Sequence, residues 1–152
     1  ILQEMGSRLK LYGYVYDGYA AHINTLQSYY DRSMELLDTS VRQALFCPQR
    51  PVYGKESDSP SGYIDPDGGC VNSLIADGCD IQGSVKNCIL FRNVRIERGA
   101  SVENCILFKD TVVKKGASLR GIITDKYVTI SENVTLTGHE RYPMVVAKGA
   151  TV

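Results

Sequence analysis

From residue 84 onward, the apolar and polar positions of the chain recur every 17 residues. Residues 84–100 are SVKNCILFRNVRIERGA, residues 101–117 are SVENCILFKDTVVKKGA, and residues 118–134 are SLRGIITDKYVTISENV. A repeat of fixed length is typical of a solenoid, in which each unit stacks on its neighbours because it cannot bury its apolar face alone. The period therefore predicts a stack of similar coils.

Within each repeat, an aliphatic residue and a smaller one alternate at six-residue spacing. Counting from Ile96, the inward positions are predicted to be Ala100, Val102, Ile106 and Phe108, and the next repeats continue the same steps. This hexapeptide pattern predicts a mainly β protein, a left-handed parallel β-helix of three sides with about eighteen residues per coil. A helical or leucine-rich repeat fits less well, because the units are rich in β-branched residues and contain no amphipathic helix.

The same counting places Leu90 and Leu107 on the outside of the coils, where they would form a small apolar stripe. Two explanations are open. The stripe is covered by another part of the chain, either the linker or an N-terminal helix, or it is an interface with another subunit. Asn87 and Asn104 are expected to form a corner ladder, because Asn tolerates tight turns.

The segment before the repeats has a different pattern of apolar and polar residues. Residues 9–19, LKLYGYVYDGY, alternate aliphatic and Tyr residues with polar ones and predict a strand. Thr25–Leu37 has apolar residues near helical spacing, and Thr25 is a suitable N-cap, so a helix is predicted there.

These patterns divide the chain into three parts. Residues 1–45 form the strand and helix, residues 46–70 a proline-rich linker, and residues 71–152 the β-helix. The linker is poorly periodic and contributes at most an edge strand around Gln49–Tyr53. Because the chain opens at Ile1 and not at Met, we expect it to be a fragment of a longer protein.

The amino-acid composition limits the classes of partner and the cellular compartment that we expect for this chain. Lys plus Arg and Asp plus Glu both total 17, so we expect no nucleic acid as a main partner, which would need a basic surplus. No apolar run approaches membrane-spanning length, and the first residues are not a signal peptide, so no membrane association is expected. Five cysteines without a CxxC pair suit a cytoplasmic protein with free thiols.

Two segments carry a family resemblance. Tyr12–Asp38, YGYVYDGYAAHINTLQSYYDRSMELLD, resembles the end of the nucleotidyltransferase domain in glucose-1-phosphate adenylyltransferases, and the repeats, with Asn72–Leu74 and Ile123–Lys126, resemble the C-terminal β-helix of that family. The resemblance implies that residues 1–45 are the strand-helix remnant of an α/β nucleotidyltransferase domain. It further implies a parent protein that acts in the synthesis of ADP-glucose and glycogen.

One motif of the family is altered here. Where the family has Trp-x-Asp-Val-Gly-Thr, this chain has Ala-Ala-His-Ile-Asn-Thr, so that His22 replaces an Asp expected to help hold the catalytic magnesium. A neutral imidazole is a poor ligand for a hard cation. This departure resembles the GlgD-type subunits, and it implies a non-catalytic chain without a cofactor. Mg²⁺ would then belong to a catalytic adenylyltransferase subunit, the expected partner in a hetero-oligomer. The plainer alternative for His22 is a surface or turn histidine.

Cations recur in the repeats as well. Arg92, Lys109 and Lys126 occupy equivalent positions in three successive coils, close enough to repel one another, and a bound anion such as phosphate would relieve that repulsion. Alternatively, the side chains splay into water beside Asp110 and Asp125. The resemblance implies that Lys126 and Lys148 stand where lysines of the family bind phosphorylated or sulfate-like effectors. We therefore name Arg92, Lys109, Lys126 and Lys148 as candidate effector-binding residues.

A second function class remains open. Hexapeptide-repeat acyltransferases use a histidine as a general base, and His139, in GHERYP, is the one histidine near the coils. A loop histidine is the simpler interpretation, and no long insertion is expected to interrupt the coils and build a substrate pocket. A zinc site with three histidines is excluded, since the chain has two.

Overall fold

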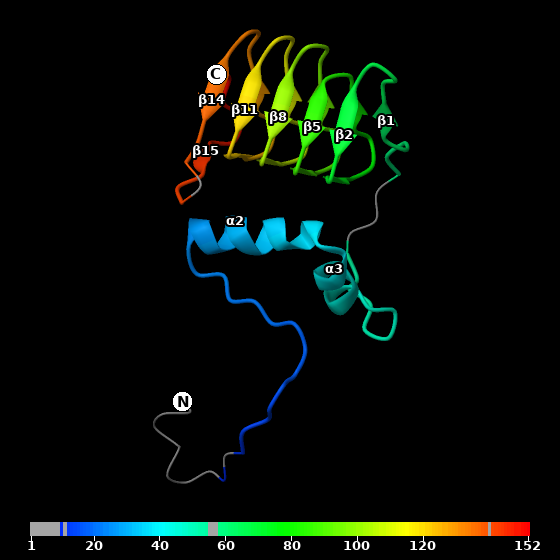
Figure 1. Ribbon diagram of the computed structural model, residues 1–152, viewed down its shortest axis with the longest axis vertical. Helices are drawn as coiled ribbons and strands as arrows, with labels where there is room; N and C mark the ends of the chain where they lie inside the picture. The colour runs from blue at the N-terminus through cyan, green and yellow to red at the C-terminus, as the bar shows by residue number, and fades with distance from the viewer. Residues whose placement is uncertain (1–9, 11, 55–57, 140) are drawn as a thin grey trace.

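The computed structural model describes residues 10, 12–54, 58–139 and 141–152 of the chain. Its main body is a parallel β-solenoid with one sheet along each of three sides (Figure 1). The hexapeptide-repeat solenoid predicted from the sequence is thus confirmed.

Each sheet has five parallel strands, and neighbouring strands come from successive coils. Sheet A contains β1 (Tyr63–Ile64), β4 (Asp80–Ile81), β7 (Arg95–Ile96), β10 (Val112–Val113) and β13 (Thr129–Ile130). Sheet B contains β2 (Gly69–Val71), β5 (Ser84–Lys86), β8 (Ser101–Glu103), β11 (Ser118–Arg120) and β14 (Thr135–Thr137). Sheet C contains β3 (Leu74–Ile75), β6 (Ile89–Leu90), β9 (Ile106–Leu107), β12 (Ile122–Thr124) and β15 (Met144–Val146).

Most coils keep the 17-residue length of the repeat, as the pairing of Ser84 with Ser101 in sheet B shows. The last coil is longer. Ile123 pairs with Val145, 22 residues later, because five extra residues enter between β14 and β15. The solenoid also begins earlier than predicted: β1 starts at Tyr63, inside the segment 46–70 that the sequence assigned to the linker.

The chain turns between sheets B and C at residues with positive φ. In successive coils these are Asn87 (φ 51°), Asn104 (φ 53°) and Gly121 (φ 63°). Asn and Gly adopt this left-handed conformation at lower cost than other residues, which explains their place at the corner. The expected corner ladder of Asn87 and Asn104 is therefore confirmed.

The interior of the solenoid is a single apolar core. Ile96, Ala100 and Val102 are buried as predicted, and so are the matching residues of the following coil, Val113 and Ala117. On sheet C, however, the prediction was wrong. Leu90 and Leu107 point into the core and are 1% and 0% exposed, whereas their neighbours Ile89, Ile106 and Ile123 form a separate cluster on the outer face.

The error has a local cause at the corner. Alternation along a strand continues only as long as the backbone stays extended, and a one-residue shift exchanges the two faces of a strand. After the left-handed turn at Asn104, Cys105 points inward and is fully buried, so the next inward residue is Leu107 and not Ile106. Cys88 and Leu90 repeat this arrangement one coil earlier.

Cys88 and Cys105, two of the three buried cysteines, satisfy backbone groups at this corner. The amide of Cys88 donates to the hydroxyl of Ser73 at 3.0 Å. One coil further, the amide of Cys105 donates to the sulfur of Cys88 at 3.4 Å, and the amide of Ile122 donates to the sulfur of Cys105 at 3.4 Å. All five cysteines are free, as expected, and burial raises the pKa of the Cys105 thiol. These thiols therefore act as acceptors in the frame of the solenoid.

The helix predicted over Thr25–Leu37 is present as α2 (Leu26–Met34) followed by the 3₁₀ turn η1 (Glu35–Leu37). Thr25 caps it, because its hydroxyl accepts a hydrogen bond from the amide of Ser28 at 3.0 Å. A second helix, α3 (Thr39–Leu45), was not predicted. Within the described residues, neither helix is long and apolar enough to cross a membrane.

Helix α2 lies along the outer face of sheet C and crosses its coils (Figure 1). Its Tyr29, Tyr30, Met34 and the following Leu37 pack against the outer isoleucines of the sheet. The ring of Tyr29 meets Phe108 edge-on, with centroids 6.4 Å apart. Of the two explanations offered for an outer apolar stripe, cover by the N-terminal helix is the one observed, although the stripe consists of isoleucines.

Two predicted strands are not found. Within residues 9–19, the described Lys10 and Tyr12–Tyr19 have no strand, and Gln49–Tyr53 is also irregular. A strand needs a neighbour to pair its backbone groups, and no described strand runs beside either segment. Alternating sequence without a pairing partner therefore did not produce β structure here.

The division of sheet C into an inner and an outer row gives a test. Ile106→Ala should lower the free energy of unfolding by about 2–5 kcal/mol, as a large-to-small change at a buried site does. Because Ile106 lies beneath α2, amide hydrogen exchange should rise mainly in that helix. Leu107→Ala, at an equally buried inner position, is the matched control and should loosen the coils. Unchanged exchange in α2 of Ile106→Ala would contradict this packing.

Candidate anion-binding site

The predicted cations stand in one column at the corner between sheets C and A. The amide that follows Lys109 donates to the carbonyl of Arg92 at 3.0 Å, and the amide that follows Lys126 donates to the carbonyl of Lys109 at 3.1 Å. The amide that follows Lys148 continues the ladder and donates to the carbonyl of Lys126 at 3.0 Å. All four candidate residues therefore occupy equivalent places in successive coils, about 4.8 Å apart.

Lys148 joins this column in spite of its sequence spacing. It follows Lys126 by 22 residues, whereas the other members are 17 apart, because the extra residues of the last coil are accommodated before β15. Sequence spacing alone placed three residues in the column. The signal for the fourth was the break in the hexapeptide pattern at GHERYP, which marks the insertion.

A pocket of about 480 Å³ lies against the column. Arg92, Lys109 and Lys126 line one part of it. Phe91 and Phe108, whose ring centroids are 4.8 Å apart, line another. The pocket thus offers cationic side chains beside an apolar wall, an arrangement suited to an anion that carries a less polar body.

Tyr127, which the sequence did not single out, lies between two of the lysines. The ammonium of Lys109 is 5.1 Å from the centre of its ring and that of Lys148 is 5.9 Å away, both within the range of cation–π attraction. The hydrogen bond with Tyr127, and after it the one with Asp110, raises the pKa of Lys109. Tyr127 and Asp110 therefore both favour the charged form of Lys109.

A carboxylate also approaches the column. Asp110 lies 3.3 Å from the ammonium of Lys109 and accepts a hydrogen bond from the side chain of Asn93 at 3.0 Å. The solvated ion-pair arrangement considered from the sequence is thus present at Lys109, next to the open pocket. An exposed pair of this kind is worth little and is screened by salt, so an anionic ligand could compete with it.

The two histidines take no part in this site. His22 is exposed in the segment that leads into α2. His139 is exposed in the inserted loop, and its Nδ1 accepts a hydrogen bond from the amide of Arg141 at 3.2 Å. Across the part of the chain that the structure describes, no three His, Cys, Asp or Glu residues gather as metal ligands.

Comparison with known proteins places this architecture in a family. The protein-family model described as "GlmU-like, C-terminal hexapeptide" matches residues 62–142, which include most of the solenoid. The chain is 41% identical over 98 residues to "Glycogen biosynthesis protein GlgD" of Bacillus subtilis (strain 168), covering 64% of this chain and 29% of that protein. It is 47% identical over 68 residues to the protein of the same name from Geobacillus stearothermophilus, covering 45% of this chain and 20% of that protein.

A third relative carries an enzyme's name. "Glucose-1-phosphate adenylyltransferase" of Acetivibrio thermocellus is 34% identical over 90 residues, covering 59% of this chain and 21% of that protein. The chain spans less than a third of the length of each of these relatives. The repeats, their three-sided fold and these matches agree: the chain belongs to the GlmU-like, C-terminal hexapeptide family, and within it to the C-terminal hexapeptide domains of the glucose-1-phosphate adenylyltransferase and GlgD proteins.

Proposed function

We propose that this domain is the regulatory and assembly part of a GlgD-type subunit and that it does not catalyse a reaction itself. In this proposal it associates with a catalytic glucose-1-phosphate adenylyltransferase subunit in the cytoplasm and serves the synthesis of ADP-glucose and glycogen. The column of Arg92, Lys109, Lys126 and Lys148 binds a phosphorylated effector. The fold holds these four cations in one column, and three of them, Arg92, Lys109 and Lys126, line one pocket; this is the observation that carries the proposal.

The relatives support the assignment to glycogen synthesis. Proteins named GlgD and proteins named glucose-1-phosphate adenylyltransferase both match the chain at 30% identity or more. His22 supports a non-catalytic role, because it stands where the family's motif has a carboxylate that suits magnesium. Magnesium would then be held by the catalytic subunit and not by this chain.

The acyltransferase alternative draws less support from the geometry of His139. A neutral imidazole carries its proton on the nitrogen opposite the one that accepts a hydrogen bond. Since Nδ1 accepts from the amide of Arg141, Nε2 holds the proton and offers no lone pair to a substrate hydroxyl or amine. Acetyl-CoA binding by calorimetry, together with a trimeric mass, would favour this alternative.

Substitutions in the column test the effector role. We expect Lys126→Ala and Lys148→Ala, made in the full-length protein and assembled with its catalytic subunit, each to raise the half-saturating concentration of a sugar-phosphate activator about tenfold. Activity without activator should change little, because neither lysine is placed at a catalytic centre. Lys86→Ala removes an exposed lysine from sheet B and is the control. An unaltered activator response in both column variants would refute the effector role.

A separate assay tests whether the domain is catalytic. The chain contains no glycine-rich nucleotide-binding segment of the family. We therefore expect this 152-residue chain, supplied with ATP, glucose 1-phosphate and magnesium, to form no ADP-glucose in a coupled pyrophosphate assay. The assembled enzyme serves as the positive control. Turnover by the isolated chain would rule out a purely regulatory role.

A further inference from the structure

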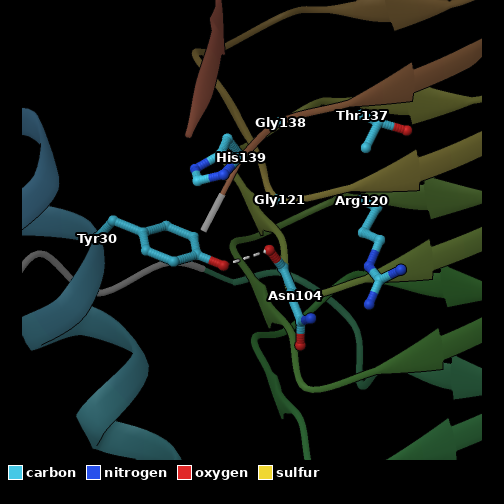
Figure 2. Close-up of a pocket in the computed structure, with 7 residues that line it drawn as sticks. All are labelled: Tyr30, Asn104, Arg120, Gly121, Thr137, Gly138 and His139. Carbon is cyan, nitrogen blue, oxygen red and sulfur yellow. Dashed lines mark hydrogen bonds between the residues drawn. The ribbon is translucent and has the colours of Figure 1, made fainter. Parts of the chain in front are cut away.

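A second cavity, of about 290 Å³, lies between α2 and the solenoid at the opposite edge of sheet C from the cation column (Figure 2). It lies at the corner between sheets B and C, where the coils turn at Asn104 and Gly121. Its polar lining comes from α2, from three successive coils and from the inserted loop: Tyr30, Asn104, Arg120, Thr137 and His139.

The insertion in the last coil builds this cavity, contrary to the expectation that no insertion would form a pocket. After β14 the chain passes Gly138, whose amide donates to the carbonyl of Arg120 at 2.7 Å, and then forms the loop that carries His139. A Cβ at Gly138 would lie 2.1 Å from the carbonyl oxygen of Gly121, so another residue would push the loop away. Glycine at this position is therefore what allows the loop to turn against the corner.

The lining presents hydrogen-bond donors. The Nε of Arg120 is 3.8 Å from Glu103, which is closer, at 3.2 Å, to Lys86. The terminal amino groups of Arg120 donate to none of the described residues. Because Nδ1 of His139 accepts from a backbone amide, its Nε2–H is a donor. Figure 2 shows His139 and Tyr30 on the side of the cavity that faces the helix, with Arg120 on the side of sheet B.

This set of groups selects the chemistry of a ligand. Among the described lining residues none carries a carboxylate, so a metal cation would meet the guanidinium of Arg120 without an acidic ligand in the lining. An apolar ligand would leave the terminal amino groups of Arg120 and the Nε2–H of His139 without partners. An oxyanion, in contrast, accepts hydrogen bonds from all of them, and the guanidinium fork suits phosphate in particular. The volume is large enough for such an ion and a few waters.

We infer that this cavity is a second anion site, separate from the cation column, and that it takes a phosphate-type oxyanion held chiefly by Arg120 and His139. The helix takes part through Tyr30, whose hydroxyl donates to the carbonyl of Asn104 at 2.7 Å at the edge of the cavity. A ligand in this seam touches both α2 and the solenoid and stabilises their docked arrangement by mass action. The site thus couples anion binding to the position of α2.

Titration of the 152-residue chain with inorganic phosphate at constant ionic strength, followed by amide NMR, tests the inference. We expect saturable shifts at Gly121, Gly138 and His139 and slower hydrogen exchange in α2. Arg120→Gln should weaken phosphate binding about tenfold or more. Arg95→Gln is a matched control and should leave binding unchanged: Arg95 is 60% exposed and pairs with an acid at 3.5 Å, and Arg120 is 61% exposed and pairs at 3.8 Å.

The role of the loop histidine is tested in the same way. His139→Ala removes the donor and should weaken binding severalfold, whereas His139→Gln keeps an N–H donor at similar reach and should retain most of it. Lys126→Ala, in the cation column, should leave these shifts intact, which separates this site from the proposed effector site. The inference is overturned if phosphate produces no saturable shifts at the three residues, if the shifts disappear in Lys126→Ala, or if Arg120→Gln binds as the unaltered chain does.

Discussion

The whole molecule depends on the parallel hydrogen-bond ladder that joins each coil to the next. Strand pairs and corner amides repeat the same partners coil after coil, so residues at equivalent positions are held one strand spacing apart. This constraint explains the continuous apolar core, since each coil contributes one layer that its neighbours cover. The same ladder keeps like-charged residues in one column, although their charges repel one another.

The sequence predicted the architecture well because the solenoid uses one local rule many times. The inward positions of sheets A and B, the corner asparagines and the capped helix all follow from short patterns near each residue. Sheet C could not be predicted in the same way. Its faces depend on the left-handed turn at Asn104, and a pattern that assumes unbroken alternation assigns Ile106 and Leu107 to the wrong sides.

The candidate sites were predictable only in part, for a related reason. Regular spacing identified Arg92, Lys109 and Lys126, but the length of the last coil hid the place of Lys148 until the backbone ladder was visible. Tyr127 and the cavity at Arg120 arise from contacts between segments that are distant in sequence, such as Tyr30 with Asn104. No local pattern encodes such contacts. The irregular stretch GHERYP nonetheless marked the place where the fold departs from its rule.

The thiols at the corner between sheets B and C have a chemical consequence of their own. Ser73, Cys88 and Cys105 each supply an acceptor for an amide of the next coil, and both sulfurs are closed off from solvent. An alkylating reagent or an oxidant can therefore reach these sulfurs only when the coils separate. Once modified, a bulkier sulfur could no longer fit over the same amide. The labelling rate of these two cysteines thus reports how often neighbouring coils separate, that is, the frequency of local unfolding in the solenoid.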